Sequence, residues 1–188
     1  MTDRQVRFVS ANPFKVREAQ SIMSAVGVTV TPIGQKIDEL QTNDEEKLVR
    51  DKALKAFDLV RTRVFVEHTG LHLTYLGGLP GGLTQVFWDS LKADRFAELF
   101  GRTTDPSAVA RTTIGYIDGR QFFLFTGELP GTIVSPPRGS RDFQWDCVFQ
   151  PKGRTATFAE MGMDEKNSIS MRRLALDQFA TFLGKSGD

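Results

Sequence analysis

The chain has 188 residues, 40% of them hydrophobic and 25% charged, and its formal net charge is +1. This composition is typical of a globular protein with one core, so we expect a single domain over residues 1–188. A balanced charge provides no broad positive field, which argues against nucleic acid and membrane surfaces as partners. The sequence has no signal-like or membrane-spanning apolar run, and the lone Cys147 rules out an internal disulfide. These features favour a cytoplasmic protein.

The first part of the chain predicts alternating strands and helices. A short β-type run at 6–9 precedes the pair Asn12-Pro13, which is favoured at the start of a helix. That helix should end at Gly27 and be followed by a strand over 28–33. A second helix should begin at 43–46, where the sequence Asn-Asp-Glu-Glu has the form of a capping box.

The next segments predict a buried strand and a half-exposed one. Residues 64–66 form a continuous apolar run, as expected for a central strand covered on both faces. Residues 71–75 alternate between apolar and polar, so we expect a separate strand there with an exposed His72. The glycine-rich stretch 77–82 is a loop signal, and 88–100 should form a third helix.

The second half of the chain is rich in strand signals. Asp118-Gly119 separates two β-type runs, 108–117 and 121–126, and predicts a hairpin. A short strand is expected at 131–134, and an apolar stripe that starts at Met171 predicts a terminal helix. The order of these elements indicates a mixed α/β domain with antiparallel strands in its middle.

The turn between the first strand and the first helix is a candidate phosphate site. Free N–H groups and the positive dipole end at the start of a helix favour an anion, and Lys15 adds a charge beside Ser10 and Asn12. The glycine and lysine spacing of a P-loop is absent. Taken alone, such a turn is more often purely structural.

Two further clusters contain candidate catalytic groups. Glu39 follows a strand and could bind a hard cation such as Mg²⁺, although an isolated loop acid is more often a solvated surface residue. Glu67 and His68 directly follow the buried run 64–66, and polar groups at the end of a central strand often line a site. His68 would be a base near neutral pH.

The segment 143–173 combines aromatic, acidic and basic residues that suit a nucleotide. Phe143 or Trp145 could stack on a base, and Asp146 could accept hydrogen bonds from it. Lys166 and Arg172 could reach phosphates or base carbonyls. The alternative is an aromatic core strand followed by a solvated helix.

Together these motifs resemble the inosine triphosphate pyrophosphatase family, also called Ham1-like. The resemblance runs from about residue 7 to residue 182 and rests on FVSANPFK (8–15), EHTGL (67–71), LGGLPG (76–81), PRG (137–139), FQWD (143–146) and EKNSIS (165–170). It implies an elongated mixed sheet flanked by helices, with a nucleotide cleft between two lobes. It also implies Mg²⁺-dependent hydrolysis of nucleoside triphosphates to monophosphate and pyrophosphate by a homodimer, with Mn²⁺ as an alternative ion.

The resemblance assigns roles to individual residues. The substrate-binding residues implied by the motifs and their chemistry are Ser10, Asn12, Lys15, Phe143, Trp145, Asp146, Lys166, Ser170, Met171 and Arg172. Glu39 is the expected metal ligand, and Lys15, Glu67 and His68 form the candidate catalytic group.

Several site positions depart from the family pattern. His68 stands where the family has aspartate, and Met171 stands where it has histidine. Gln144 and Ala11 replace glycines. Imidazole is a poor Mg²⁺ ligand and methionine donates no hydrogen bond, so both metal use and base choice should differ. Three hypotheses follow: a pyrophosphohydrolase with changed base preference, a related hydrolase that uses His68 as its base on another substrate, or an inactive nucleotide-binding protein.

Overall fold

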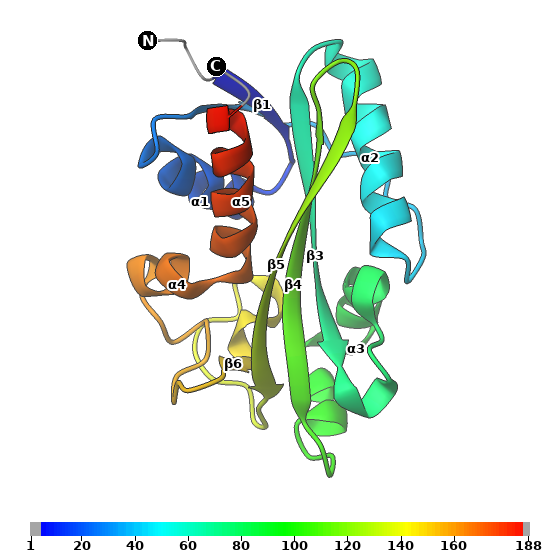
Figure 1. The fold of residues 1–188 in the computed structure, drawn as a ribbon. Helices are drawn as coiled ribbons and strands as arrows, with labels where there is room; N and C mark the ends of the chain where they lie inside the picture. Colours follow the sequence, from blue (N-terminus) through cyan, green and yellow to red (C-terminus); the bar gives the residue numbers. More distant parts are fainter. Residues whose placement is uncertain (1–4, 186–188) are drawn as a thin grey trace.

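A six-stranded mixed sheet forms the centre of the molecule in the computed structural model, which describes residues 5–185 (Figure 1). The strands are β1 (Gln5–Val9), β2 (Thr29–Ile33), β3 (Val64–Leu73), β4 (Ser107–Ile117), β5 (Phe122–Ile133) and β6 (Phe149–Pro151). Their order is β2-β1-β3-β4-β5-β6. β1 pairs in parallel with β2 and β3, and the remaining pairs are antiparallel. The expected mixed α/β sheet is confirmed.

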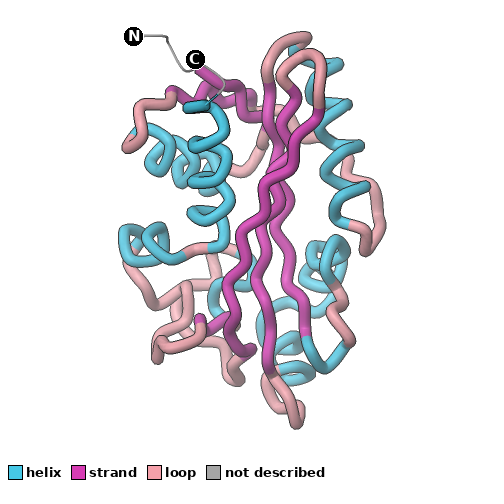
Figure 2. The backbone as a smooth tube through the Cα atoms, in the orientation of Figure 1, coloured by secondary structure: helices cyan, strands magenta, loops and turns pink. Residues whose placement is uncertain are grey.

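Helices cover both faces of this sheet (Figures 1 and 2). They are α1 (Pro13–Ser24), α2 (Glu45–Val60), α3 (Thr84–Phe100), α4 (Met163–Ile169) and α5 (Met171–Lys185), with short 3-10 turns η1 (Thr74–Leu76), η2 (Gly81–Leu83) and η3 (Gln144–Cys147). In Figure 1, α1 and α5 lie on one side of the long strands and α2 and α3 lie on the other. The long β3, β4 and β5 give the molecule its elongated shape (Figure 2).

Side-chain alternation along β3 explains why its apolar run is continuous. Phe65 packs in the core under α1 and α5, where its ring stacks on Phe8 at 4.4 Å between centroids. Its neighbours Val64 and Val66 belong to the core under α2 instead. Because successive side chains of a strand point to opposite faces, a strand covered on both faces must be apolar at every position.

The structure extends β3 beyond the predicted buried run, to Leu73. Leu71 and Leu73 are buried under α3, so the expectation of a separate, half-exposed strand over 71–75 is wrong. Gly70 permits this continuity, because a Cβ there would lie 2.5 Å from the carbonyl oxygen of Gly81. His72 is also not exposed as expected: its side chain is 16% accessible and lies 3.0 Å from a carboxylate oxygen of Glu45. Both faces of this strand are therefore covered along its whole length.

Two element boundaries differ from the sequence expectation. Helix α2 is capped by Asp44, whose side chain accepts a hydrogen bond from Lys47 N, so Asn43 does not form the expected capping box. Helix α3 begins at Thr84, before the predicted start, because the buried Thr84 hydroxyl accepts from Leu71 N and donates to Gly81 O. These two bonds anchor α3 against β3.

The predicted hairpin between β4 and β5 is confirmed at Asp118-Gly119. Asp118 accepts hydrogen bonds from two backbone amides across the turn, and Gly119 has a φ of 107°, in the region that favours glycine. The short strand expected at 131–134 is the end of β5, which continues to Ile133. The terminal helix α5 begins at Met171 as expected.

Candidate functional site

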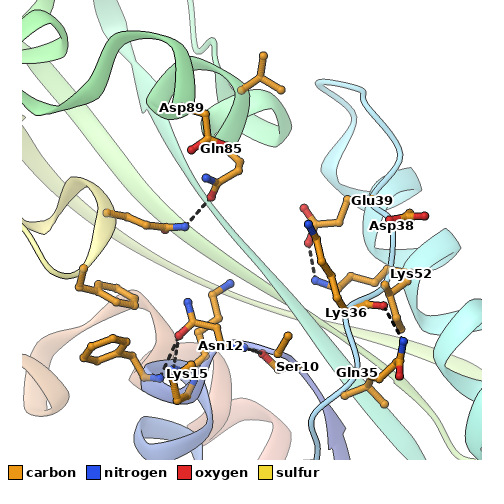
Figure 3. Close-up of a pocket in the computed structure, with 18 of the residues that line it drawn as sticks. Ser10, Asn12, Lys15, Gln35, Lys36, Asp38, Glu39, Lys52, Gln85 and Asp89 are labelled. Carbon is orange, nitrogen blue, oxygen red and sulfur yellow. Dashed lines mark hydrogen bonds and ion pairs between the residues drawn. The ribbon is translucent and has the colours of Figure 1, made fainter.

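A cavity of about 740 Å³ opens where the parallel strands β1 and β2 end (Figure 3). One side consists of the turn 10–15 before α1, the loop 35–41 after β2, and Lys52 of α2. The opposite side consists of the start of α3 and residues 142–144 before and at η3. Crevices beyond the carboxyl ends of parallel strands are the usual ligand sites of α/β folds.

Asn12 closes the start of helix α1. Its side-chain oxygen accepts from Phe14 N at 2.9 Å and from Lys15 N at 3.3 Å, and its carbonyl oxygen accepts from Val16 N. Pro13 has no N–H to offer. The expectation of free amides in this turn is therefore wrong: the cap uses them, and attraction for an anion here depends on the helix dipole and on lysine side chains.

Lysine side chains reach the cavity from two elements and are already paired with acids. Lys15 Nζ lies 3.0 Å from Glu67 Oε1, and burial lowers the pKa of Lys15, although Glu67 partly opposes this. Lys52 Nζ is bonded to the Glu39 carboxylate and donates to Glu67 O at 2.9 Å. The charged side chains of the lining are three lysines and four acids: Lys15, Lys36, Lys52, Asp38, Glu39, Asp89 and Asp142. The lining is not strongly positive.

A network of buried ion pairs connects α1, β3 and α5. Arg172, fully buried at the start of α5, donates to Glu67 through Nε at 2.8 Å and Nη2 at 3.1 Å. Its Nη1 bonds to Glu18 of α1. Glu18 also lies 3.2 Å from Lys166 Nζ, which is 2.5 Å from Asp146 Oδ2. The structure thus brings together four of the predicted site residues, Glu67, Asp146, Lys166 and Arg172, which come from two distant segments of the chain.

Glu18 was missed in the sequence analysis. It follows Lys15 by three residues on α1, so both side chains project from the same side of the helix. A charged residue directly before the buried Ala19 of the apolar stripe was the available signal. A buried charge of this kind needs a partner, and its partners are Arg172 and Lys166.

Burial shifts the pKa of two groups in this network. Burial raises the pKa of Asp146 to about 6, against the opposing charge of Lys166. Burial lowers the pKa of Arg172 to about 9. Asp146 Oδ1 is buried and has no hydrogen-bond partner among residues 5–185. One acceptor oxygen of Asp146 is therefore buried beside Lys166 without a partner among these residues.

Phe143 is the predicted aromatic that lies on the cavity wall. Its ring is half-buried and lies 5.3 Å from the ring of Phe14, centroid to centroid. Lys166 Nζ lies 4.2 Å from the centroid of Phe143, within cation–π range. The aromatic wall of the cavity and the buried ion network are thus in direct contact.

Six predicted substrate residues lie outside the cavity lining. Asp146, Lys166 and Arg172 belong to the buried ion network, and the other three side chains are packed in the core. Trp145 is 1% exposed and packs edge-on against Phe149, and Met171 is 0% exposed in the same core. Ser170 is fully buried, and its Oγ accepts from Arg173 N at 3.1 Å. The alternative reading of this segment as core therefore holds for these three side chains, and none is placed for the expected contact with a ligand.

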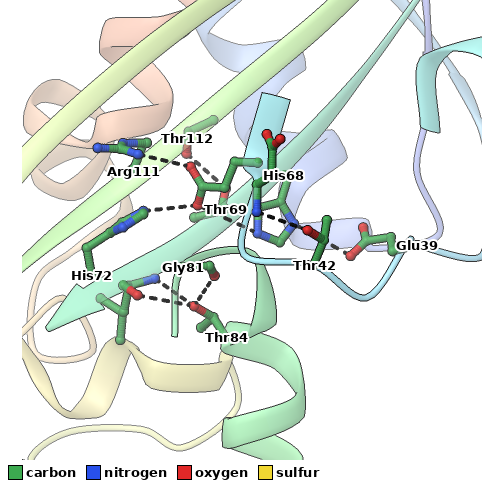
Figure 4. A network of polar contacts seen from close by, with 12 residues as sticks. Glu39, Thr42, His68, Thr69, His72, Gly81, Thr84, Arg111 and Thr112 are labelled. Carbon is green, nitrogen blue, oxygen red and sulfur yellow. Dashed lines mark hydrogen bonds and ion pairs between the residues drawn. The ribbon is translucent and has the colours of Figure 1, made fainter. Parts of the chain in front are cut away.

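His68 lies behind Glu39, not on the cavity wall (Figure 4). Its Nδ1 is 3.5 Å from Glu39 Oε2, and its Nε2 is 4.0 Å from Glu45 Oε1. Glu45 is itself held by His72 and by Arg111. Burial would raise the pKa of Glu39, but the hydrogen bond with His68 and the charge of Lys52 outweigh this and hold it well below its usual value. His68 is therefore placed to orient Glu39.

The described part of the chain contains no cluster of three or more His, Cys, Asp or Glu side chains that could by itself hold a metal ion. Glu39 is the one predicted metal ligand, and it lines the cavity. Cys147 is buried, and burial raises the pKa of its thiol. Within residues 5–185, no helix is both long enough and apolar enough to cross a membrane.

The fold and the cavity define an α/β protein with a ligand crevice at the ends of its parallel strands, one wall aromatic and the other lined by lysines. The model of the Ham1 family matches residues 6–182, and the chain belongs to this family. The resemblance inferred from the sequence motifs is confirmed.

Relatives with named activities match nearly the whole chain. The inosine triphosphate pyrophosphatase of Yarrowia lipolytica is 38% identical over 185 residues, 97% of each chain. The dITP/XTP pyrophosphatase of Methanopyrus kandleri is 32% identical over 177 residues, 94% of each chain. The Coxiella burnetii HAM1 protein superposes with a TM-score of 0.81 at 23% identity, covering 96% of this chain and 98% of that one. The Staphylococcus aureus Ham1 protein gives 0.78 at 22% identity, covering 97% and 99%. At these identities the two structures establish the fold alone.

Proposed function

We propose that the protein hydrolyses nucleoside triphosphates to the monophosphate and pyrophosphate, with a base preference that differs from the family pattern. The observation that supports this most is the division of the cavity into an aromatic wall, Phe143, and an opposite wall with Lys36 and Lys52. The volume of about 740 Å³ lies within the range of small-molecule sites. The named activities of the relatives support the same reaction.

The ligand orientation follows from these two walls. A base stacked on Phe143 has Lys166 behind the ring, at 4.2 Å from its centroid. Asp146, which the resemblance makes a reader of the base edge, is buried outside the cavity lining. The triphosphate then extends past Ser10 and Asn12 toward the lysines. Arg172 acts indirectly in this arrangement, because it is fully buried and holds Glu67 through two hydrogen bonds.

The charge of the lining argues for a divalent cation that accompanies the substrate. Three lysines against four acids leave no excess positive charge for a triphosphate. Magnesium bound through phosphate oxygens, water and one or two carboxylates supplies that charge, and Glu39 is the lining residue that fits as its protein ligand. Mn²⁺ has the same preference for carboxylate and water ligands. When bound, the ion stabilises negative charge that develops on the phosphates.

The residues of the chain suggest how the reaction is catalysed. Attack of water on the α-phosphorus forms a new P–O bond, breaks the bond to the oxygen that bridges the α- and β-phosphorus, and releases pyrophosphate and a proton to the solvent. Lys15 and Lys52 line the cavity, which supports a role for both in stabilising the developing charge. Glu39, whose pKa is held low, is a weak proton acceptor and serves as a ligand. The position of His68 behind Glu39 favours an orienting role over the alternative in which His68 is the base for a different substrate.

Product analysis by phosphorus NMR tests this function. Purine and pyrimidine triphosphates are incubated with the protein and Mg²⁺ or Mn²⁺ in ¹⁸O-labelled water. We expect monophosphate and pyrophosphate, with the label in the monophosphate, because water attacks the α-phosphorus. Release of inorganic phosphate alone, or label in pyrophosphate, contradicts the proposed reaction.

A His68→Asp variant separates hydrolysis from binding alone. If only this variant turns over, while the natural protein binds triphosphates in calorimetry, the natural protein is an inactive nucleotide-binding protein. Turnover by both supports the proposed hydrolase, and the pH–rate profile then shows whether His68 titrates in the reaction.

We also propose that the protein is a cytoplasmic homodimer, as the family resemblance implies. Light scattering coupled to gel filtration measures the oligomeric state directly. A mass near 21 kDa for the eluted species contradicts the dimer.

A further inference from the structure

A side-chain bridge crosses one wall of the cavity, next to the aromatic ring. Gln144 Nε2 donates to Gln85 Oε1 at 2.5 Å, and this contact is drawn as a dashed line to Gln85 in Figure 3. Gln85 lies in the first turn of α3, and Gln144 is the first residue of η3. Both line the cavity. The bridge therefore joins the two elements on this side of the cavity directly beside Phe143.

The backbone of Gln144 has a conformation that is unfavourable for a residue with a side chain. Its φ is 38°, in the left-handed region where residues other than glycine are uncommon. Glycine would adopt this conformation without that cost. Strained residues persist where their surroundings hold them, and they concentrate at ligand sites. The strain at Gln144 is therefore typical of a residue with a role at a ligand site.

The bridge uses one N–H of Gln144 and the carbonyl oxygen of Gln85. Gln144 Oε1 and Gln85 Nε2 have no hydrogen-bond partner in the part of the chain described, 5–185. A glutamine amide carries a carbonyl oxygen and an NH2 group with two N–H donors, so the joined pair still presents a carbonyl acceptor on Gln144 and N–H donors on Gln85. This pattern is complementary to a nucleobase edge with a carbonyl oxygen beside a ring N–H.

We propose that Gln144, held in place by Gln85, determines base specificity by hydrogen bonding to the edge of a base stacked on Phe143. The inference rests on the proposed nucleotide site and adds the residue that reads the base there. Gln144 Oε1 accepts from the ring N–H, and Gln85 Nε2 donates to the neighbouring carbonyl. The class of ligand preferred is a nucleoside triphosphate whose base carries a ring N–H beside a carbonyl oxygen. Purine and pyrimidine bases can both carry this edge, so the preference is wider than the family pattern.

A substrate pair that differs only at this edge tests the proposal. Inosine triphosphate has the ring N–H and the carbonyl, whereas unsubstituted purine riboside triphosphate lacks both. We compare kcat/KM for the two in the natural protein, Gln144→Gly, Gln85→Ala and Gln178→Ala. The last is a matched control, because Gln178 donates a hydrogen bond to Thr126 O outside the cavity lining. Gln144→Gly should fold well, because it relieves the backbone strain.

We expect the preference for inosine triphosphate to fall about threefold to tenfold in Gln144→Gly and Gln85→Ala, the size expected for loss of a neutral hydrogen bond. It should be unchanged in Gln178→Ala. An equal loss of kcat/KM on both substrates, or no loss, overturns the specificity role while leaving the hydrolase function intact. If calorimetry and turnover detect no triphosphate binding or hydrolysis in the natural protein, both proposals fail.

Discussion

Replacing Asp146 with asparagine should change how stability depends on pH. Burial raises the pKa of this carboxyl to about 6 from its usual 3.8. A group with a raised folded pKa favours the folded state when protonated, so its contribution falls as the pH rises from about 4 to about 6. Above that window the ionised Asp146 lowers the free energy of unfolding by a constant amount. Asparagine has no such titration.

The magnitude follows from the two pKa values. A shift from 3.8 to about 6 corresponds to about 3 kcal/mol once both states are ionised. Linkage places roughly half of this change between about pH 5 and about pH 7.5. The free energy of unfolding of Asp146→Asn, relative to the natural protein, should therefore rise by about 1–2 kcal/mol over that interval.

Urea unfolding of both proteins at about pH 5 and about pH 7.5 measures how the difference between their free energies of unfolding changes with pH. Titrating groups outside the ion network of Asp146, Lys166 and Glu18 contribute equally to both proteins and cancel. Asp142→Asn is a suitable control, because Asp142 is exposed. A difference near zero refutes the reasoning, and a difference of opposite sign shows that the Lys166 ion pair at 2.5 Å outweighs the burial of Asp146.

Three further substitutions test other parts of the site. Arg172→Met leaves Glu67 and Glu18 without their shared partner, and urea unfolding should show a loss of about 3–5 kcal/mol. Gly70→Ala puts a Cβ 2.5 Å from Gly81 O, and the midpoint of thermal unfolding should fall by an amount equivalent to about 1–3 kcal/mol. Gly162→Ala, with no atom within 4 Å, should not show this drop. Lys52→Met should raise the Kd for a non-hydrolysable triphosphate measured by calorimetry. An unchanged Kd contradicts the proposed contact between Lys52 and the phosphates.

Local signals in the sequence predicted much of the fold. Asn12-Pro13 and Asp118-Gly119 specify their turns through the chemistry of neighbouring residues, and both occur as expected. The continuity of β3 was not predictable, because it depends on Gly70 meeting the carbonyl oxygen of Gly81. Contacts of that kind follow from tertiary packing, and the pattern of apolar residues does not show them.

The sequence predicted which residues belong to the site better than it predicted where their side chains lie. The motifs identified Glu67 and Arg172, which the fold brings within hydrogen-bond distance of each other across 105 positions of sequence. Sequence reasoning treated Trp145 and Met171 as ligand contacts, since residue type alone does not distinguish an aromatic wall from an aromatic core. It also treated His68 as a group facing the ligand, and its position behind Glu39 depends on which face of β3 the loop 35–41 covers.

Helix α1 carries both ends of an electrostatic connection across the molecule. Lys15 on its first turn and Glu18 on the next meet β3 and α5 through Glu67 and Arg172. A phosphate that draws Lys15 away from Glu67 changes the charge balance around Arg172, and from there around Lys166. Thermodynamic reciprocity then requires that whatever occupies the base end alters phosphate affinity by the same factor. Pyrophosphate and a nucleoside should therefore not bind independently, and each should report the presence of the other.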